Sequence, residues 1–153
     1  MRAVSFILAV MAMLIAPQLQ EPWFGTWKLN IAKSTADREV RYKRGIAKIE
    51  RWEDGLKVTY DLVGTRGGLT HMEWTGKFDG KDYPVQGVDY VLTNAYSRID
   101  DHSYQIITRV DGVQTTTAKV VISPDGKTLT TQTAAKNAQG NTITGTTVYE
   151  RER

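Results

Sequence analysis

The chain has 153 residues, a formal net charge of +3 and no cysteine. This length suits one domain with a sizeable core, and the lack of cysteine excludes disulfides, thiolate metal sites and a cysteine nucleophile. The densest basic stretch, residues 38–51, is interrupted by Glu39 and Glu50. It lacks the aromatic platforms of a nucleic-acid-binding surface, so we expect no nucleic-acid partner.

The first elements in chain order form a leader. Met1-Arg2 precedes an apolar run from Ala3 to Ile15, and Ala16 follows. A positive start, a short apolar run and a small residue near its end are typical of a secretory signal peptide. The run is shorter than the roughly 20 residues of a membrane-spanning helix. The sequence predicts a signal peptide over 1–20, cleaved within 16–20, and an exported domain over 21–153, periplasmic or secreted. An uncleaved anchor or a buried N-terminal helix is the alternative.

The rest of the chain has the pattern of short β-strands. A first strand surrounds Trp27, and runs rich in Thr, Val, Ile and Tyr follow near 43–52, 56–63, 69–78, 89–99, 103–111, 113–123, 127–136 and 141–151. Turn residues separate these runs, and Asp111-Gly112 is a strong hairpin signal. Short turns indicate an antiparallel meander. Closure removes its bare edges, so we predict an all-β, up-and-down barrel of about eight to ten strands, with a β-sandwich as the alternative.

The turns also predict which side chains face the interior. Two-residue and four-residue loops at 111–112 and 124–127 place Arg109, Gln114 and Thr116 on one face with Ile122 and Leu129. A buried arginine needs a partner, which would be a ligand carboxylate or an internal acid such as Glu73. The alternative is that Arg109 points into water at the open end. Trp74 either lines the same cavity or packs in the core.

Three segments resemble lipocalins and fatty-acid-binding proteins. Phe24-Gly25-Thr26-Trp27 is similar to the opening strand of these families, and Val148-Tyr149-Glu150-Arg151 to the closing strand. The segment 77–85 resembles one in exported bacterial lipocalin-like proteins. The resemblance implies that Arg151 lies over the ring of Trp27, a cation–π contact that closes the barrel beside Gly25 and Tyr149. The polar segment 30–37 is too short for the helical lid of fatty-acid-binding proteins, and their Arg-x-Tyr motif is absent.

No catalytic or metal-binding pattern stands out. His71 and His102 lack ligand-spaced neighbours, and no nucleophile elbow, phosphate loop or dinucleotide motif exists. We therefore predict no metal, no cofactor and no enzymatic activity. The expected function is a lipocalin-like barrel that carries a small hydrophobic or amphipathic ligand near Arg109, Gln114, Thr116 and Trp74. We expect a monomer, with no stable membrane insertion after the leader is removed. The alternatives are a filled barrel acting as a protein-interaction or inhibitor module, and an isomerase-like cavity enzyme.

Overall fold

A computed structural model describes residues 20–35 and 42–153, so the predicted signal peptide falls almost entirely outside the described residues. The described part of the chain forms ten strands and one short 3-10 helix. In chain order these are β1 Gly25–Leu29, η1 Ile31–Lys33, β2 Tyr42–Trp52, β3 Gly55–Gly64, β4 Leu69–Gly76, β5 Asp82–Gln86, β6 Leu92–Asp100, β7 Ser103–Val110, β8 Val113–Ile122, β9 Thr128–Lys136 and β10 Thr142–Arg151.

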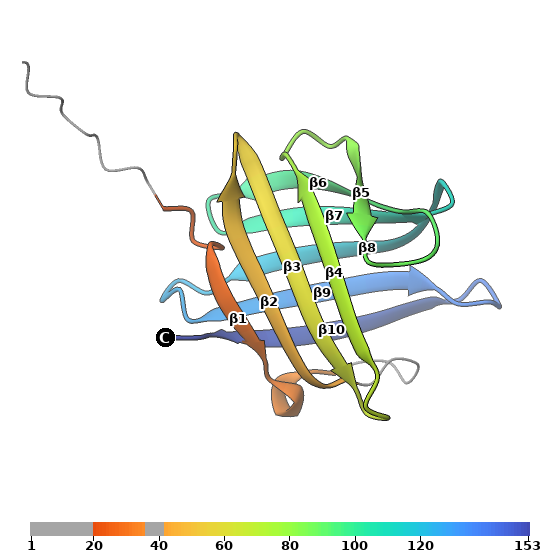
Figure 1. The fold of residues 1–153 in the computed structure, drawn as a ribbon, viewed down its shortest axis with the longest axis horizontal. Coiled ribbons are helices and arrows are strands. Elements are labelled where there is room, and N and C mark those ends of the chain that lie inside the picture. Colours follow the sequence, from red (N-terminus) through yellow and green to blue (C-terminus); the bar gives the residue numbers. More distant parts are fainter. Residues whose placement is uncertain (1–19, 36–41) are drawn as a thin grey trace, which may run out of the picture.

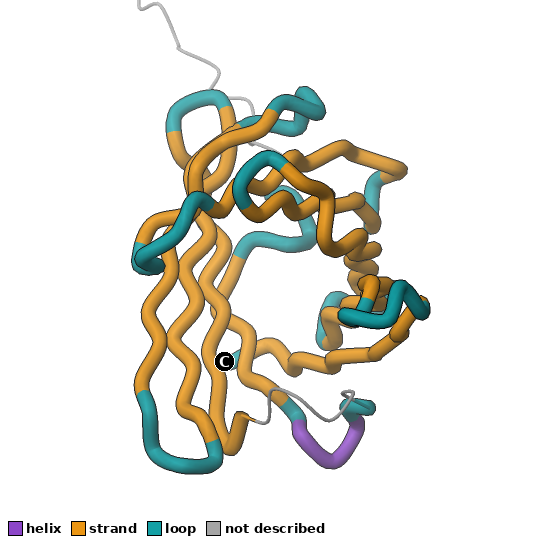
Figure 2. The backbone as a smooth tube through the Cα atoms, turned by 90° about the vertical axis from the view of Figure 1, so that its right-hand side faces the viewer, coloured by secondary structure: helices purple, strands orange, loops and turns teal. Residues whose placement is uncertain are grey.

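The strands form a closed antiparallel barrel. Each strand pairs with its neighbours in sequence, and β1 also pairs with β10 through Trp27–Arg151 and Leu29–Tyr149. In Figure 1, β1 to β4 cross diagonally in front of β6 to β10, and β5 lies at the upper edge between the two groups. Figure 2, seen from the right-hand side, shows the strands running around a common axis. The predicted meander and its closure are confirmed, and the sandwich alternative is wrong.

Local sequence explains the tight hairpins. Asp111 and Gly112 both have positive φ, 49° and 79°, and they join Val110 directly to Val113. The predicted two-residue turn is therefore correct. The four-residue loop 124–127 is also present, because Ser123 N–H donates to Thr128 O (2.9 Å) and Ile122 pairs with Leu129.

The sequence pattern did not predict strand β5. β5 contains Pro84, has five residues and pairs with β4 at only two positions, Glu73–Gln86 and Trp74–Val85. Proline removes a backbone donor and demotes a run as a strand signal, so the sequence shows only a connection there. The next strand consequently starts at Leu92 rather than at residue 89.

The two ends of the barrel differ. The end that we call the closed end carries residues 20–24 and the connections 53–54, 77–81, 101–102 and 123–127. The opposite, open end carries η1 and the connections 65–68, 87–91, 111–112 and 137–141. Fully buried Trp23 and Trp27 lie toward the closed end, where the largest core side chains gather. Within residues 20–35 and 42–153, no helix has the length and apolar character needed to cross a membrane.

Candidate functional site

The closed end is fixed by Arg151. Its guanidinium carbon lies 4.2 Å from the centroid of the Trp27 ring. Its nitrogens donate to three backbone carbonyls, those of Gly126 (2.7 Å), Phe24 (2.6 Å) and Pro22 (2.6 Å). Partial burial lowers the pKa of the Arg151 guanidinium through desolvation. This contact confirms the closure expected from the resemblance, and Tyr149 is buried two pairs further along the same ladder.

Gly25 belongs to the same closure. Its φ is 142°, and a Cβ atom at this position would overlap Nη1 of Arg151. Only glycine lets the backbone of β1 come this close to the guanidinium. Gly25 therefore has the structural role that the Gly-x-Trp pattern predicts.

Two more arginines cover aromatic rings at this end of the barrel. Arg98 lies 5.0 Å from the Trp23 ring centroid and donates to both carboxylate oxygens of Glu21 (2.9 and 3.1 Å). Arg51 lies 5.8 Å from the Phe24 ring. Cation–π contacts of this kind each contribute about 0.5–2 kcal/mol. The three guanidinium groups thus cover the rings of Trp27, Trp23 and Phe24 at this end of the barrel.

Between this closure and the middle of the barrel, the interior is filled by aromatic side chains. Trp23 packs edge-on against Phe78 (5.2 Å between centroids) and Tyr104 (5.5 Å). Tyr104 stacks on Tyr96 (5.4 Å), and Tyr96 stacks on Trp74 (3.9 Å, interplanar angle 14°). We call these five residues the aromatic floor. Aromatic side chains therefore fill the part of the barrel next to the closed end.

A cavity of about 200 Å³ lies on the open-end side of the aromatic floor and is lined by residues of β3 to β7. Its lining is mainly apolar and includes Val58, Tyr60, Met72, Trp74, Val85, Leu92, Asn94 and Thr108. Glu73 also borders it, but the Glu73 carboxylate pairs with Lys57 Nζ (2.9 Å) on the outer face of the sheet. Small apolar cavities with a few placed polar groups are typical ligand sites.

The cavity contains one organised polar pair. Thr108 Oγ1 donates to Asn94 Oδ1 (2.8 Å), and Trp74 Nε1 donates to the backbone oxygen of Asn94 (3.2 Å). The Tyr60 phenol also faces this space, and burial raises its pKa to about 12. The sequence pattern did not predict Tyr60, Asn94 and Thr108 as site residues. Continuing the alternation from Trp74 into β3 and from Tyr96 into β6 would have found the first two.

The structure separates the four predicted ligand residues. Trp74 borders the cavity, and Thr116 is on the lumenal side, where it pairs with Thr108. Arg109 is not lumenal. A β-bulge between Thr108 and Arg109 shifts the register, so Thr108 rather than Ile107 pairs opposite Thr116.

Arg109 and Gln114 consequently point outward, and the prediction that they face the interior is wrong. Arg109 Nη1 donates to Asp82 Oδ1 (2.6 Å) of β5, and its side chain is 28% exposed. Gln114 Nε2 donates to Thr117 Oγ1 (3.2 Å) on the outside of β8. Trp52, at the end of β2, is 49% exposed, and Lys57 Nζ lies 5.3 Å from the centroid of its ring.

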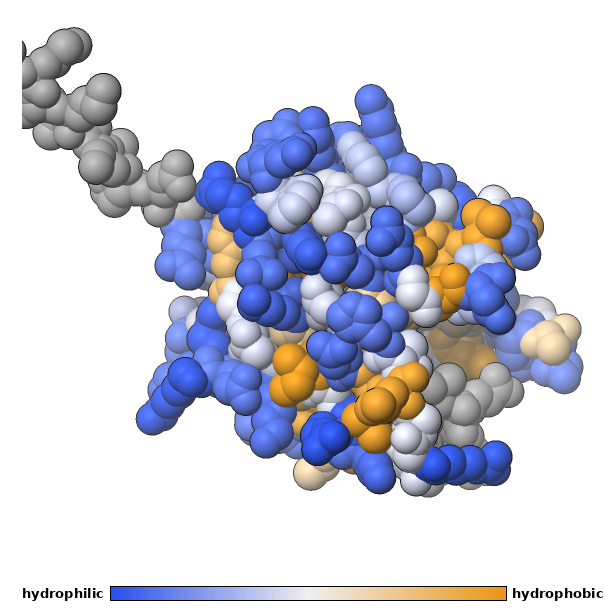
Figure 3. Space-filling model, in the orientation of Figure 1, coloured by the Kyte–Doolittle hydropathy of each residue, from blue (hydrophilic) through white to orange (hydrophobic). Residues whose placement is uncertain are grey.

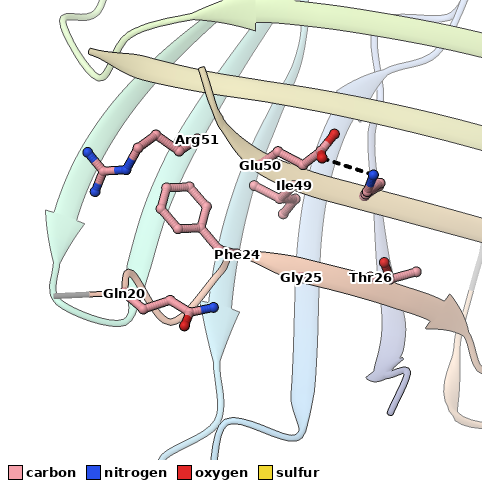
Figure 4. A pocket seen from close by; sticks show the side chains of 8 residues that line it. Gln20, Phe24, Gly25, Thr26, Ile49, Glu50 and Arg51 are labelled. Atoms are coloured by element: carbon pink, nitrogen blue, oxygen red, sulfur yellow. Dashed lines mark ion pairs between the residues drawn. The ribbon is translucent and has the colours of Figure 1, made fainter. Parts of the chain in front are cut away.

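Two larger hollows lie on the outer surface. One, of about 460 Å³, runs between the segment 20–26 and the end of β2 (Figure 4). Phe24 reaches toward Arg51 there, and Glu50 pairs with Lys48 (2.9 Å). The other, also about 460 Å³, follows the threonine-rich outer face of β8 to β10. Both are wide surface depressions, and neither contains a buried polar group without a partner.

The open end carries most of the exposed apolar surface. In the described part of the chain, seven large apolar side chains are exposed, and five of them lie at the open end: Ile31, Leu69, Tyr90, Val91 and Val113. In Figure 3 apolar side chains form separate patches, one at the upper right and others in the lower middle of the view. The large exposed apolar side chains of the described residues are therefore concentrated at the open end.

Fold and cavity together define a closed, ten-stranded antiparallel β-barrel, compatible with a calycin-like barrel. No family model matches the chain, and a search of curated proteins finds no match either.

Proposed function

We propose that this protein is an exported, lipocalin-like binding barrel that holds a small, mainly apolar molecule in its lumen. The observation that carries the proposal is the cavity of about 200 Å³ between the aromatic floor and the open end. Side chains in protein interiors normally interdigitate and leave little free space, so a hollow of this size in the lumen is space that a ligand could occupy.

Three features support a binding role rather than catalysis. Among the described residues, the cavity lining is mainly apolar, its polar pair Asn94–Thr108 is already hydrogen-bonded, and the one acid that borders it, Glu73, is paired on the outer face. The Arg151–Trp27 closure is what the lipocalin resemblance predicts, so it supports that identity. The apolar leader of the sequence supports export to the periplasm or beyond, and we propose a monomer.

Native mass spectrometry of the protein isolated from its own host tests the proposal. We expect an additional mass that a cavity-filling variant does not retain. Thr108→Phe places a ring in the lumen, whereas Ile107→Phe adds the same ring at the neighbouring, outward position. If Ile107→Phe retains the molecule and Thr108→Phe loses it, the site is lumenal. Equal retention by both folded variants would contradict the proposal and favour the filled interaction module.

A further inference from the structure

The proposed function does not specify the chemical class of the ligand. The charge, hydrogen-bonding groups and size of the cavity restrict which molecules can bind there. We propose that the lumen selects an uncharged molecule about the size of one substituted ring, whose single hydrogen-bond acceptor is bound by the side-chain amide of Asn94. This inference rests on the proposed function, because it concerns the same cavity.

Charge is the first criterion. Two cations on the strands that line the cavity are already paired on the outer face, Arg109 with Asp82 (2.6 Å) and Lys57 with Glu73 (2.9 Å). Arg51, Arg98 and Arg151 lie at the closed end, below the aromatic floor. No cation borders the cavity among the residues described around it. A carboxylate entering it would be desolvated without a counter-ion, which is strongly unfavourable.

Hydrogen bonding is the second criterion. Asn94 is held in place by two bonds that it accepts, from Thr108 Oγ1 at its side chain and from Trp74 Nε1 at its backbone. Its Nδ2 group, which has two N–H donors, forms no hydrogen bond within the described part of the chain. A ligand carbonyl or ether oxygen would satisfy a donor that is fixed before binding. We therefore expect an acceptor on the ligand rather than a donor.

Size and shape are the third criterion. An apolar engineered cavity of about 150 Å³ in another protein holds benzene, so about 200 Å³ has room for one ring with a short substituent. Trp74 borders this space with its ring fixed by stacking on Tyr96 at 3.9 Å. Flat aromatic groups pack well against such a fixed ring. A long acyl chain would extend beyond this cavity.

Two matched pairs of probes test the inference on the full chain, by calorimetry and ligand-observed NMR at pH 7. Methyl benzoate and benzoate differ in charge, and acetophenone and ethylbenzene differ in the acceptor oxygen. We expect methyl benzoate to bind at least about tenfold more tightly than benzoate. Acetophenone should bind about fivefold more tightly than ethylbenzene, as expected for one net hydrogen bond.

Variants then assign the acceptor contact. Asn94→Leu should abolish the preference for acetophenone over ethylbenzene, because leucine has a similar shape but no amide. Gln114→Leu makes the same change on the outer face and should leave the preference intact. Thr108→Val, which is nearly isosteric, gives a second measurement should Asn94→Leu fold poorly. It frees Asn94 to rotate and should reduce the preference at least twofold.

The outcomes separate this inference from the proposed function. Binding of none of the four probes overturns both. Equal affinity for benzoate and methyl benzoate overturns the inference while lumenal binding stands. An unchanged acetophenone preference in folded Asn94→Leu and Thr108→Val overturns the assignment to Asn94. Loss of the preference in both lumenal variants and its survival in Gln114→Leu support the inference.

Discussion

At the scale of single residues, Arg151 determines how the barrel closes. Its planar guanidinium both covers the Trp27 ring and donates to three carbonyls, so charge and shape act together. Lysine carries its charge on a single ammonium group, which lacks the planar arrangement of N–H donors that lets a guanidinium reach several carbonyls at once. The short motifs around Trp27 and Arg151 carry this contact in sequence, which is why it could be predicted from the sequence.

Arg151→Lys should therefore destabilise the protein although the charge is kept. We expect a loss of about 1–2 kcal/mol of unfolding free energy, since two or more carbonyls lose their donors. Urea denaturation followed by tryptophan fluorescence measures this loss. Arg153→Lys is the control, because Arg153 is exposed two residues later. Equal midpoints for the two variants would mean that the closure contributes nothing to stability.

Trp27 and Trp52 allow a matched comparison of two tryptophans. Trp27 is fully buried, and its Nε1 donates to Trp23 O (2.9 Å), whereas Trp52 is 49% exposed. Trp27→Ala should cost about 3–5 kcal/mol, as buried aromatic truncations do. Trp52→Ala should change stability by less than about 1 kcal/mol. Thermal melts of both variants against the parent test this, and similar shifts would contradict the assigned core.

The buried tyrosines predict a loss of stability in alkali. Burial raises the pKa of Tyr60 to about 12, above its ordinary value of 10.0, and it also raises the pKa values of Tyr96 and Tyr104. Between pH 10 and 12 the unfolded chain releases these protons while the folded chain keeps them. The free energy of unfolding should therefore be unaffected by these groups below pH 10 and should fall above it, by up to about 1.4 kcal/mol per pH unit and group.

Urea denaturation between pH 9 and 12 measures that slope. Tyr60→Phe should flatten it, because the unfolded variant has one ionising phenol fewer. Tyr90→Phe removes a phenol that is half exposed and serves as the control. A parent protein whose stability is constant up to pH 12 would contradict the burial of these phenols.

At the scale of strands, the sequence predicts the turns correctly but does not predict the bulge between β7 and β8. The Asp111-Gly112 hairpin fixes Val110 opposite Val113, as the sequence predicts. A bulge between Thr108 and Arg109, two residues from that pair, shifts the register of β7 against β8. Because strand side chains alternate with period two, the β7 residues that the sequence predicts to face inward face outward, and the reverse. The segment 114–117 has no sequence signal for this bulge, because Gln114 is followed by three consecutive threonines that fit either register. This is why Arg109 was misplaced while Thr116 was not.

β5 should be the least stable strand of the barrel. It pairs with β4 at two positions and with β6 at three, whereas β3 pairs over eight or more residues on both sides. We expect the β5 amides to exchange with deuterium at least about a hundredfold faster than those in the middle of β3, because local opening breaks fewer bonds. Methyl benzoate should slow β5 exchange, since Val85 borders the cavity. Protection of β5 equal to that of β3 would contradict this.

At the scale of the whole molecule, the closed end ties the start of the domain to its last strand. The backbone oxygens of Pro22 and Phe24 accept from Arg151, Trp23 is fully buried, and Glu21 pairs with Arg98. The barrel therefore includes the four residues before β1. Turn patterns in the sequence predict closure in general, but the contribution of residues 21–24 emerges only when the closed end is assembled in three dimensions.

Removal of the predicted signal peptide must preserve this segment. We expect a chain that begins at Gln20 to melt within about 2 °C of the full-length protein. A chain that begins at Gly25 lacks Trp23 and two carbonyl acceptors of Arg151, and should lose at least about 3 kcal/mol. If the predicted signal peptide is cleaved, mass spectrometry of the mature protein should accordingly find a first residue between 17 and 21. A mature protein that starts after Trp23, or equal melting of the two shortened chains, would show that the barrel closes without this segment.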